Sequence, residues 1–354
     1  MHRLPILRVE MPIRCAQVFR KVGHRAQVRY VSQPLSGGRS PSLRSRLAGA
    51  PTPDYTVPTT QYVTNRVIPA NTEAADRHAL KPEHAHLPLV FMLTLTQASI
   101  GAYLASLLSQ TSSSQIGLAL FGALTMTLGL AASTSHLGRP LGAWRAFLGL
   151  RKSWLSREIV VFGGCFPLAI AYSAALFFEQ IPSAVTLAAG ILAVGSGLLG
   201  IFCSVMIYHD TQRAFWRFPV SAGKFFGATL TLGLSAYLAM SAITQVEFNR
   251  GLWACAILAV GIKLALEARQ LLAVKTEGYR PAKQSARLML QPLLSITRVR
   301  YSVSLIGIVL LGLSCFGSTF AIPGFVCILA GELLERTLFF KAVVALKMPG
   351  GVQV

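Results

Sequence analysis

The chain has 354 residues, of which 53 % are hydrophobic and only 13 % are charged, and its formal net charge is +20. Soluble domains carry about 25 % charged residues. The excess of basic residues alone would suit a nucleic-acid-binding protein, but the apolar residues are gathered into long runs that are typical of transmembrane helices. Composition therefore disfavours a soluble enzyme, a disulfide-stapled secreted domain, a nucleic-acid-binding protein and a disordered chain.

The six cysteines are too far apart for a cluster or a structural zinc site. Iron–sulfur clusters and zinc sites use close pairs such as C-x-x-C. The cysteines are Cys15, Cys165, Cys203, Cys255, Cys315 and Cys327. No two of them lie within four positions of each other, and all but Cys15 fall inside apolar runs. We therefore expect no iron–sulfur cluster and no metal in this chain.

The N-terminal segment is basic and polar. Residues 1–50 contain ten Lys or Arg and one acidic residue, Glu10, with no apolar run long enough for a secretory signal. Three interpretations stay open: a mitochondrial transit peptide, a basic cytoplasmic arm, or an upstream extension outside the functional chain. We expect 1–86 to be a mostly irregular tail without a core of its own.

Eight apolar runs follow, each near the ~20 residues that cross a bilayer. The chain is therefore expected to be an all-α, polytopic membrane protein with a transmembrane domain over 87–347 and a short C-terminal tail over 348–354. The predicted spans are 87–109, 116–136, 159–178, 183–207, 222–243, 251–272, 301–318 and 322–342.

Charge in the connections predicts the orientation. The N-terminal tail and the loops 137–158, 208–221 and 273–300 share one side, called side A, and are rich in Lys and Arg. The loops on the opposite side, called side B, carry one basic residue, Arg250. The positive-inside rule then places side A, and both termini, in the cytoplasm.

Charged residues inside the spans need a reason, because they are costly in lipid. Lys263 and Glu267 are four apart in the sixth span and share a helix face. The eighth span contains Glu332 and Arg336. One interpretation is a salt-bridge network inside the bundle, and the other is a proton route or a polar lining for a head group, with Glu332 as its first candidate.

The segment 136–158 is the most unusual in the chain and reads HLGRPLGAWRAFLGLRKSWLSRE. His136 ends the second span, and a histidine can exchange a proton near neutral pH. Arg139 and Arg145 are suited to a carbonyl or an acidic surface, and Trp144 suits headgroup depth. Ser153 or Ser156 could cap the third span. A haem held by His136 and His209, which follows the fourth span, is an alternative.

Two motifs carry a family resemblance. The first is His136-Leu137-Gly138-Arg139-Pro140 followed by Leu155-Ser156-Arg157-Glu158-Ile159, and the second is Ala330-Gly331-Glu332-Leu333 in the last span. At these helix ends, they make the chain resemble the DmsC-like membrane anchor subunits of the dimethyl sulfoxide reductase family, over roughly 87–347. The NrfD/polysulfide reductase anchors are a neighbouring family with a similar loop.

The resemblance implies a division of labour. Such anchors oxidise quinol, either menaquinol or ubiquinol, in anaerobic respiration. They dock a four-cluster ferredoxin-like subunit, which passes the electrons to a molybdopterin catalytic subunit. The anchor itself carries no haem or iron–sulfur cluster. We accordingly expect a bacterial inner-membrane protein that contacts lipid and holds at most a quinol site, so that the chain is a subunit of an oxidoreductase complex rather than a complete enzyme.

The resemblance also assigns residues. His136 would take a proton from quinol, Gly138 would let the ring approach, and Glu158 with Ser156 would complete the site. The residues expected around the quinol are His136, Gly138, Arg139, Pro140, Trp144, Arg145 and Ser156. Those expected to face the ferredoxin-like subunit are Arg151, Lys152 and Trp154.

The sequence departs from the family in two ways. Some relatives have a basic residue where this chain has Gly142, so either Arg139 or Arg145 would contact the head group. In well-known relatives the corresponding loop faces the periplasm, whereas the charges here place it in the cytoplasm. A multi-span transporter and a purely structural tether remain the alternative functions, although the two halves of the bundle show no clear internal repeat.

Overall fold

The computed structural model describes residues 72–74, 79–136, 140–278, 280–344 and 349–352. The chain divides into two units, one of residues 80–344 and one of its two ends, 1–79 with 345–354. In the second unit, strand β1 (Thr72–Ala74) pairs antiparallel with strand β2 (Pro349–Val352), with Thr72 opposite Val352.

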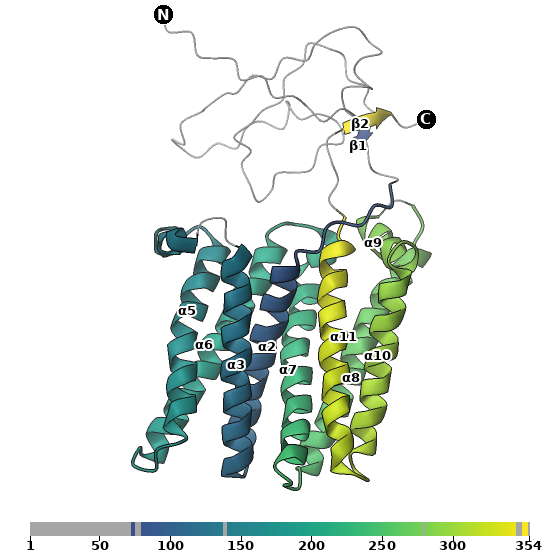
Figure 1. Ribbon diagram of the computed structural model, residues 1–354. Helices are drawn as coiled ribbons and strands as arrows, with labels where there is room; N and C mark the ends of the chain where they lie inside the picture. The colour runs from purple at the N-terminus through teal and green to yellow at the C-terminus, as the bar shows by residue number, and fades with distance from the viewer. Residues whose placement is uncertain (1–71, 75–78, 137–139, 279, 345–348, 353–354) are drawn as a thin grey trace, which may run out of the picture. The chain divides into compact units, whose positions relative to one another are not determined.

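Eight helices in the described residues are long and apolar enough to cross a membrane, which confirms the predicted fold class (Figure 1). They are α2 (Leu87–Leu108), α3 (Ser112–His136), α5 (Trp154–Ala175), α6 (Ser183–His209), α7 (Phe218–Ile243), α8 (Arg250–Leu271), α10 (Leu294–Leu313) and α11 (Ala321–Lys341). Shorter elements lie in the connections: η2 (Pro140–Arg145), α4 (Ala146–Gly149), η3 (Ala214–Trp216), η4 (Leu272–Lys275), α9 (Pro281–Leu290) and η5 (Ser318–Phe320).

Helices α2 and α7 form the centre of the bundle. In each of them, two thirds of the most apolar 18-residue stretch is buried. Figure 1 shows them between the α3, α5 and α6 group and the α8, α10 and α11 group. They cross at Gly101 and Gly233, where a Cβ on Gly101 would lie 2.8 Å from the Gly233 nitrogen. Only glycine at both positions lets the two backbones approach this closely.

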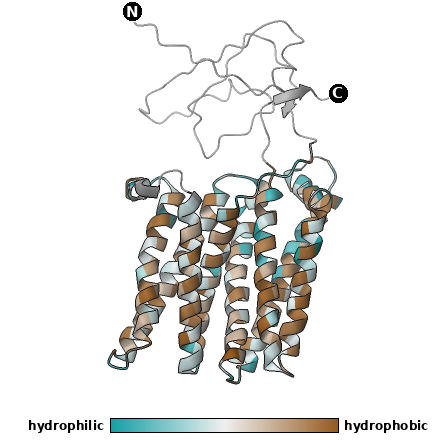
Figure 2. Ribbon diagram, in the orientation of Figure 1, coloured by the Kyte–Doolittle hydropathy of each residue, from teal (hydrophilic) through white to brown (hydrophobic). Residues whose placement is uncertain are grey.

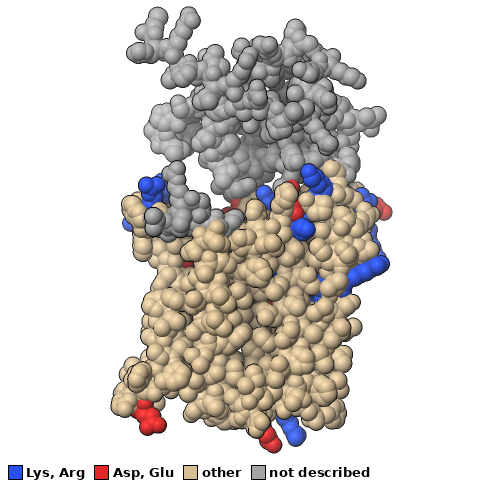
Figure 3. Space-filling model, in the orientation of Figure 1, with Lys and Arg blue, Asp and Glu red and all other residues tan. Residues whose placement is uncertain are grey.

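The outer helices expose apolar side chains along their middle turns, as a lipid-facing surface requires. Figure 2 shows the hydrophobic positions running down the long helices, with hydrophilic positions gathered toward the end that carries α9. The exposed apolar residues of these middle turns include Leu124, Leu128, Ile191, Leu192, Leu258, Ile262, Leu305 and Ile306. In Figure 3, blue basic side chains gather near that same end of the bundle.

Two predicted helix starts were wrong by five residues or more. The seventh span begins at Leu294 rather than 301, so that Arg298 and Arg300 belong to α10 and not to a loop. Because their charges lower the local hydropathy, the hydropathy pattern does not reveal the first two turns of α10. The third span begins at Trp154 rather than 159, so that Glu158 lies inside α5. The loop predicted over 273–300 also contains helix α9.

Candidate functional site

The segment between α3 and α5 lies outside the long helices. His136 is the last residue of α3, and its side chain, like Gly138 and Arg139, lies outside what the structure describes. Pro140 begins η2, which ends at Arg145 and leads directly into α4. This segment presents large exposed apolar side chains next to basic ones. They are Trp144, Phe147 and Leu148, with Arg145, Arg151 and Lys152.

The start of α5 is fixed by a cap and by a folded-back arginine. The Ser153 hydroxyl accepts a hydrogen bond from the Ser156 nitrogen at 3.3 Å, so Ser153 is the cap. Arg157 donates from Nε to the Leu150 carbonyl at 2.8 Å and from Nη2 to the Arg151 carbonyl at 3.1 Å. Its guanidinium also lies 4.0 Å from the ring centroid of Trp154. These contacts tie the connection to the helix that follows it.

Glu158 lies one turn into α5, about 6 Å along the axis from its first residue. The side chain is buried, and its carboxylate accepts a hydrogen bond from the Ser204 hydroxyl on α6. Among the residues that the structure describes, no Lys, Arg or His forms an ion pair with it. A buried carboxylate with a single hydroxyl donor keeps free acceptor capacity and can take up a proton.

The other predicted site residues differ in how far their side chains are exposed. Ser156 is half-buried and packs against Gly149, where an added Cβ would meet its hydroxyl. Trp144 is 61 % exposed, and Arg145 lies beside it, with its guanidinium carbon 5.8 Å from the indole centroid. Trp154, predicted to face a partner, is half-buried and packs edge-on against Phe202 at 5.8 Å.

The charged residues of the sixth and eighth spans form a network, which the sequence predicted as one of two interpretations. The Lys263 ammonium lies 2.5 Å from Glu267 and 2.9 Å from Glu332. Arg300 on α10 contacts the same two carboxylates, at 3.0 Å from Glu267 and 3.3 Å from Glu332. It also donates to the Ser304 hydroxyl. Two cations and two carboxylates from three helices therefore form a neutral quartet.

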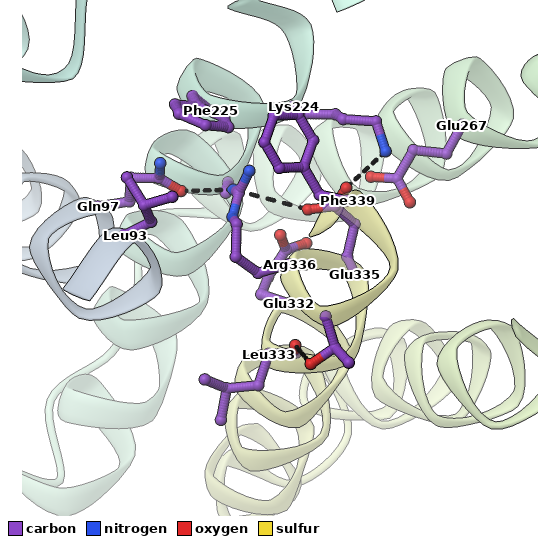
Figure 4. Close-up of polar contacts among 12 residues, drawn as sticks. Leu93, Gln97, Lys224, Phe225, Glu267, Glu332, Leu333, Glu335, Arg336 and Phe339 are labelled. Carbon is purple, nitrogen blue, oxygen red and sulfur yellow. Dashed lines mark hydrogen bonds and ion pairs between the residues drawn. The ribbon is translucent and has the colours of Figure 1, made fainter. Parts of the chain in front are cut away.

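A second ion pair lies beside the quartet and includes residues that the sequence did not single out as site residues. Lys224 on α7 lies 2.6 Å from the Glu335 carboxylate on α11. The neighbouring Arg336 donates from Nη2 to the Gln97 side-chain oxygen on α2 at 2.9 Å and lies 3.6 Å from Glu335 (Figure 4). This arrangement joins the central helices α2 and α7 to α11.

An aromatic cluster lies beside this ion pair, toward side A, with Tyr208 at its centre. Its ring is 5.0 Å from Phe339 and 5.7 Å from Phe225, centroid to centroid. Trp216 stacks on Phe339 at 5.4 Å and donates from its indole nitrogen to the Phe339 carbonyl. The rings of this cluster pack α6, η3, α7 and α11 together.

Sequence reasoning missed Ser204, Lys224, Gln97 and Arg300 as site residues. Ser204 and Gln97 are single polar residues in apolar runs, and no local pattern distinguishes them from ordinary helix serines and glutamines. The predicted fifth span, 222–243, contains Lys224 near its start, whereas Arg300 falls in the loop predicted over 273–300. The signal available for both was the helix phase, which points each toward the bundle interior.

The described residues contain no group of three or more His, Cys, Asp or Glu side chains that could hold a metal ion. His209, weighed as a haem ligand, ends α6 with its ring 6.0 Å from Phe218. A small polar recess of about 40 Å³ lies at the opposite end of the bundle. Its lining includes Ser114, Tyr237 and Glu247, and it is far smaller than the ~300 Å³ or more of a typical ligand pocket.

Two curated proteins are similar to this chain in sequence. The chain is 31 % identical over 207 residues to a sulfite dehydrogenase subunit of Allochromatium vinosum, a match that covers 51 % of this chain and 62 % of that protein. It is 27 % identical over 161 residues to a component of the anaerobic dimethyl sulfoxide reductase of Haemophilus influenzae, covering 44 % and 58 %. The chain thus spans about six tenths of the length of these curated relatives.

The family model described as DMSO reductase anchor subunit (DmsC) matches residues 82–341, which include all eight long helices and the segment from His136 to Glu158. A match of this extent includes both sequence motifs and the helices that carry them. The chain therefore belongs to the DMSO reductase anchor subunit (DmsC) family.

Proposed function

We propose that this chain anchors a molybdopterin oxidoreductase in the bacterial inner membrane, oxidises quinol there and passes the electrons to a ferredoxin-like iron–sulfur subunit. Family membership supports the anchor role, and the two curated relatives are named as parts of a sulfite dehydrogenase and of a dimethyl sulfoxide reductase. The observation that carries the quinol step is Glu158, a buried carboxylate near one end of the bundle with Ser204 as its hydroxyl donor.

The chemistry requires a base at the membrane edge. Oxidation of quinol to quinone releases two electrons and two protons, and the protons need an acceptor within hydrogen-bond reach of the ring hydroxyls. Glu158 would take one proton, and His136 at the end of α3 would take the other. Ser204 would orient the Glu158 carboxylate, while the electrons leave through the partner subunit, since no cluster or haem is expected in this chain.

The partner would dock on side A, over the segment between α3 and α5. There the exposed Arg145, Arg151 and Lys152 would meet an acidic surface, and Trp144 with its apolar neighbours would supply contact area. The basic loops favour a cytoplasmic side A. The catalytic subunits would then be cytoplasmic as well.

The first experiment is purification of the gently solubilised protein with its partners, identified by mass spectrometry, with molybdenum and iron assayed on the same sample. A molybdopterin subunit and a cysteine-rich iron–sulfur subunit are expected. An intact, folded preparation with neither partner nor metal would contradict the anchor role and would favour the transporter.

The second experiment tests the quinol step in the assembled complex. Glu158→Gln should lower quinol oxidation by about 100-fold or more while assembly is preserved, because the amide cannot accept the proton. Ser204→Ala should have a smaller effect in the same direction. Glu277→Gln, the same change at an exposed carboxylate between α8 and α9, should leave the rate unchanged. Full activity of Glu158→Gln would favour a structural tether.

A further inference from the structure

Basic residues gather at the side A ends of α8 and α10 and on α9, which connects the two helices. Between residues 269 and 298 the chain has six Lys or Arg and a single acidic residue, Glu277. Five of the six basic residues are exposed: Arg269, Lys275, Arg280, Arg287 and Arg298. No ion pair within the described part of the chain involves any of these five. The described residues therefore leave the positive charge of this surface uncompensated.

Arg269 lies on the lipid-facing stripe of α8. The exposed apolar residues Leu258, Ile262 and Leu266 recur at helical spacing, and Arg269 and Leu272 continue the same stripe. Arg269 thus has an exposed apolar residue before it and after it along the stripe. Leu272, which is 56 % exposed, lies nearer side A than Arg269 does. The arginine is therefore at the edge of the apolar surface and not in the loop beyond it.

Arg298 has the equivalent place on α10. It is exposed together with Val299, and Leu305 and Ile306 continue the exposed face toward the middle of the helix. Arg298 is about 6 Å along the axis from Leu294, the first residue of α10. Each of these two outer helices thus carries one exposed arginine where its lipid-facing stripe approaches side A.

A buried ion pair shows that the two arginines lie at one depth. Arg300 on α10 lies 3.0 Å from Glu267 on α8, so these two residues are at the same level of the bundle. Arg269 and Arg298 are each two residues nearer side A than a member of that pair, which is about 3 Å of rise and about 200° of rotation on each helix. The buried pair faces inward, and the two exposed arginines face outward. This level is close to the helix ends, where phospholipid headgroups meet the acyl chains.

Helix α9 adds basic residues beside this level. It packs against α8, η4 and α10, and its Leu288 and Met289 are buried. Lys283 donates to the Thr276 carbonyl at 2.6 Å, which ties α9 to the residue that follows η4. Arg287 is four residues further along and so lies on the same face of α9, where it is exposed. A docked helix, and not only a loop, therefore carries this part of the basic surface.

We propose that the side A ends of α8, α9 and α10 bind anionic phospholipid, with Arg269 and Arg298 on the phosphate groups and the two apolar stripes against the acyl chains. A guanidinium forms bidentate hydrogen bonds with phosphate, and basic surfaces at the ends of transmembrane helices attract anionic lipid. The excess of basic over acidic residues favours a headgroup with a net negative charge over a zwitterionic one. An acidic protein surface fits less well, because the exposed Leu272 lies between Arg269 and the loops of side A.

Native mass spectrometry of the purified full-length chain in detergent tests the site. Phosphatidylglycerol is the anionic probe, and phosphatidylcholine with the same acyl chains is the neutral one. The wild-type chain should bind phosphatidylglycerol more tightly than phosphatidylcholine. Arg269→Gln and Arg298→Gln should each weaken the tightest phosphatidylglycerol binding by about fivefold, and the double variant by about 25-fold. Binding as tight in Arg269→Gln/Arg298→Gln as in the wild type would overturn the proposal.

Arg217→Gln is the matched control, because it removes an exposed arginine on side A at the start of α7, outside this surface. It should bind phosphatidylglycerol like the wild type. A loss equal to that of Arg269→Gln would mean that binding follows net charge alone, and would count against the proposal. Glycerol 3-phosphate, which carries the phosphate without acyl chains, should not displace the lipid. Displacement by it would overturn the role of the apolar stripes.

Thermal unfolding in nanodiscs gives a second readout, in a bilayer. Replacing part of the phosphatidylcholine by phosphatidylglycerol should raise the unfolding temperature of the wild type, because a ligand that binds only the folded state stabilises it. The rise should be smaller in Arg269→Gln/Arg298→Gln, and an equal rise in both proteins would contradict the site. If the double variant kept its lipid preference but bound the purified iron–sulfur partner more weakly, the surface would be a protein interface instead. Neither lipid measurement involves quinol, so failure of the proposed function would leave their result intact.

Discussion

The Lys224 ammonium on α7 lies 2.6 Å from the Glu335 carboxylate on α11, and both side chains are buried. Lys224 lies about 9 Å along the helix from Phe218, the first residue of α7, well below the helix end. The pair therefore joins a central helix to the last helix inside the membrane-spanning part of the bundle. Each residue is costly without the other.

Removing one member of this pair should destabilise the protein more than removing both. Lys224→Met removes the closest cation from buried Glu335 and leaves only Arg336, 3.6 Å away, so we expect a loss of about 3 kcal/mol in the free energy of unfolding. Lys224→Met/Glu335→Gln should recover most of that loss. Unfolding in detergent, followed by circular dichroism, measures both. A double variant no more stable than Lys224→Met would contradict the ion-pair interpretation.

The crossing of α2 and α7 should not tolerate a side chain. A Cβ on Gly101 would meet the backbone of Gly233, which cannot move aside as a flexible side chain can. Gly101→Ala should separate the two central helices and lower the free energy of unfolding by about 1–3 kcal/mol. Gly195→Ala on α6 is the control, because nothing lies within 4 Å of a Cβ there. Equal stability of the two variants would contradict the close approach.

Much of the architecture, but less of the site, could be predicted from the sequence. The eight spans, the Ser153 cap and the Lys263–Glu267 contact follow from local patterns: apolar run length, a capping serine and an i,i+4 spacing. Arg300 could not be assigned to the same network, because its carboxylate partners come from α8 and α11, far away in the chain. Such contacts depend on how helices pack, which no local pattern encodes.

Glu158 and Ser204 illustrate the same limit. The family motif marked Glu158, but its hydroxyl donor is 46 residues further along the chain. The roles assigned to Ser156 and to the residues around His136 stay predictions, since they depend on the quinol. For Trp154 the structure offers a local role beside the proposed docking role, because the ring lies under the Arg157 guanidinium.

Arg157 should control the order of the connection between α4 and α5. Its two hydrogen bonds to the Leu150 and Arg151 carbonyls need the fork of a guanidinium. Arg157→Lys and Arg157→Ala should both loosen this connection and speed tryptic cleavage after Arg151 and Lys152, by severalfold. Arg298→Ala, at an exposed arginine on α10, should not. Unchanged cleavage in Arg157→Ala would show that the tie is dispensable.

The exposed basic residues beside α4 should determine how strongly the proposed iron–sulfur partner binds. Arg151→Glu/Lys152→Glu reverses two charges on side A, and we expect about a tenfold weaker association that also depends less on salt, because rim charges act mainly by steering encounter. Arg250→Glu, at the start of α8 on side B, is the matched control and should bind like the wild type. Binding of the purified partner to each variant in nanodiscs, measured over a range of salt concentrations, separates the outcomes. If Arg250→Glu alone weakened binding, the partner would dock on side B, and the assignment of the electron-transfer face to the segment between α3 and α5 would be wrong.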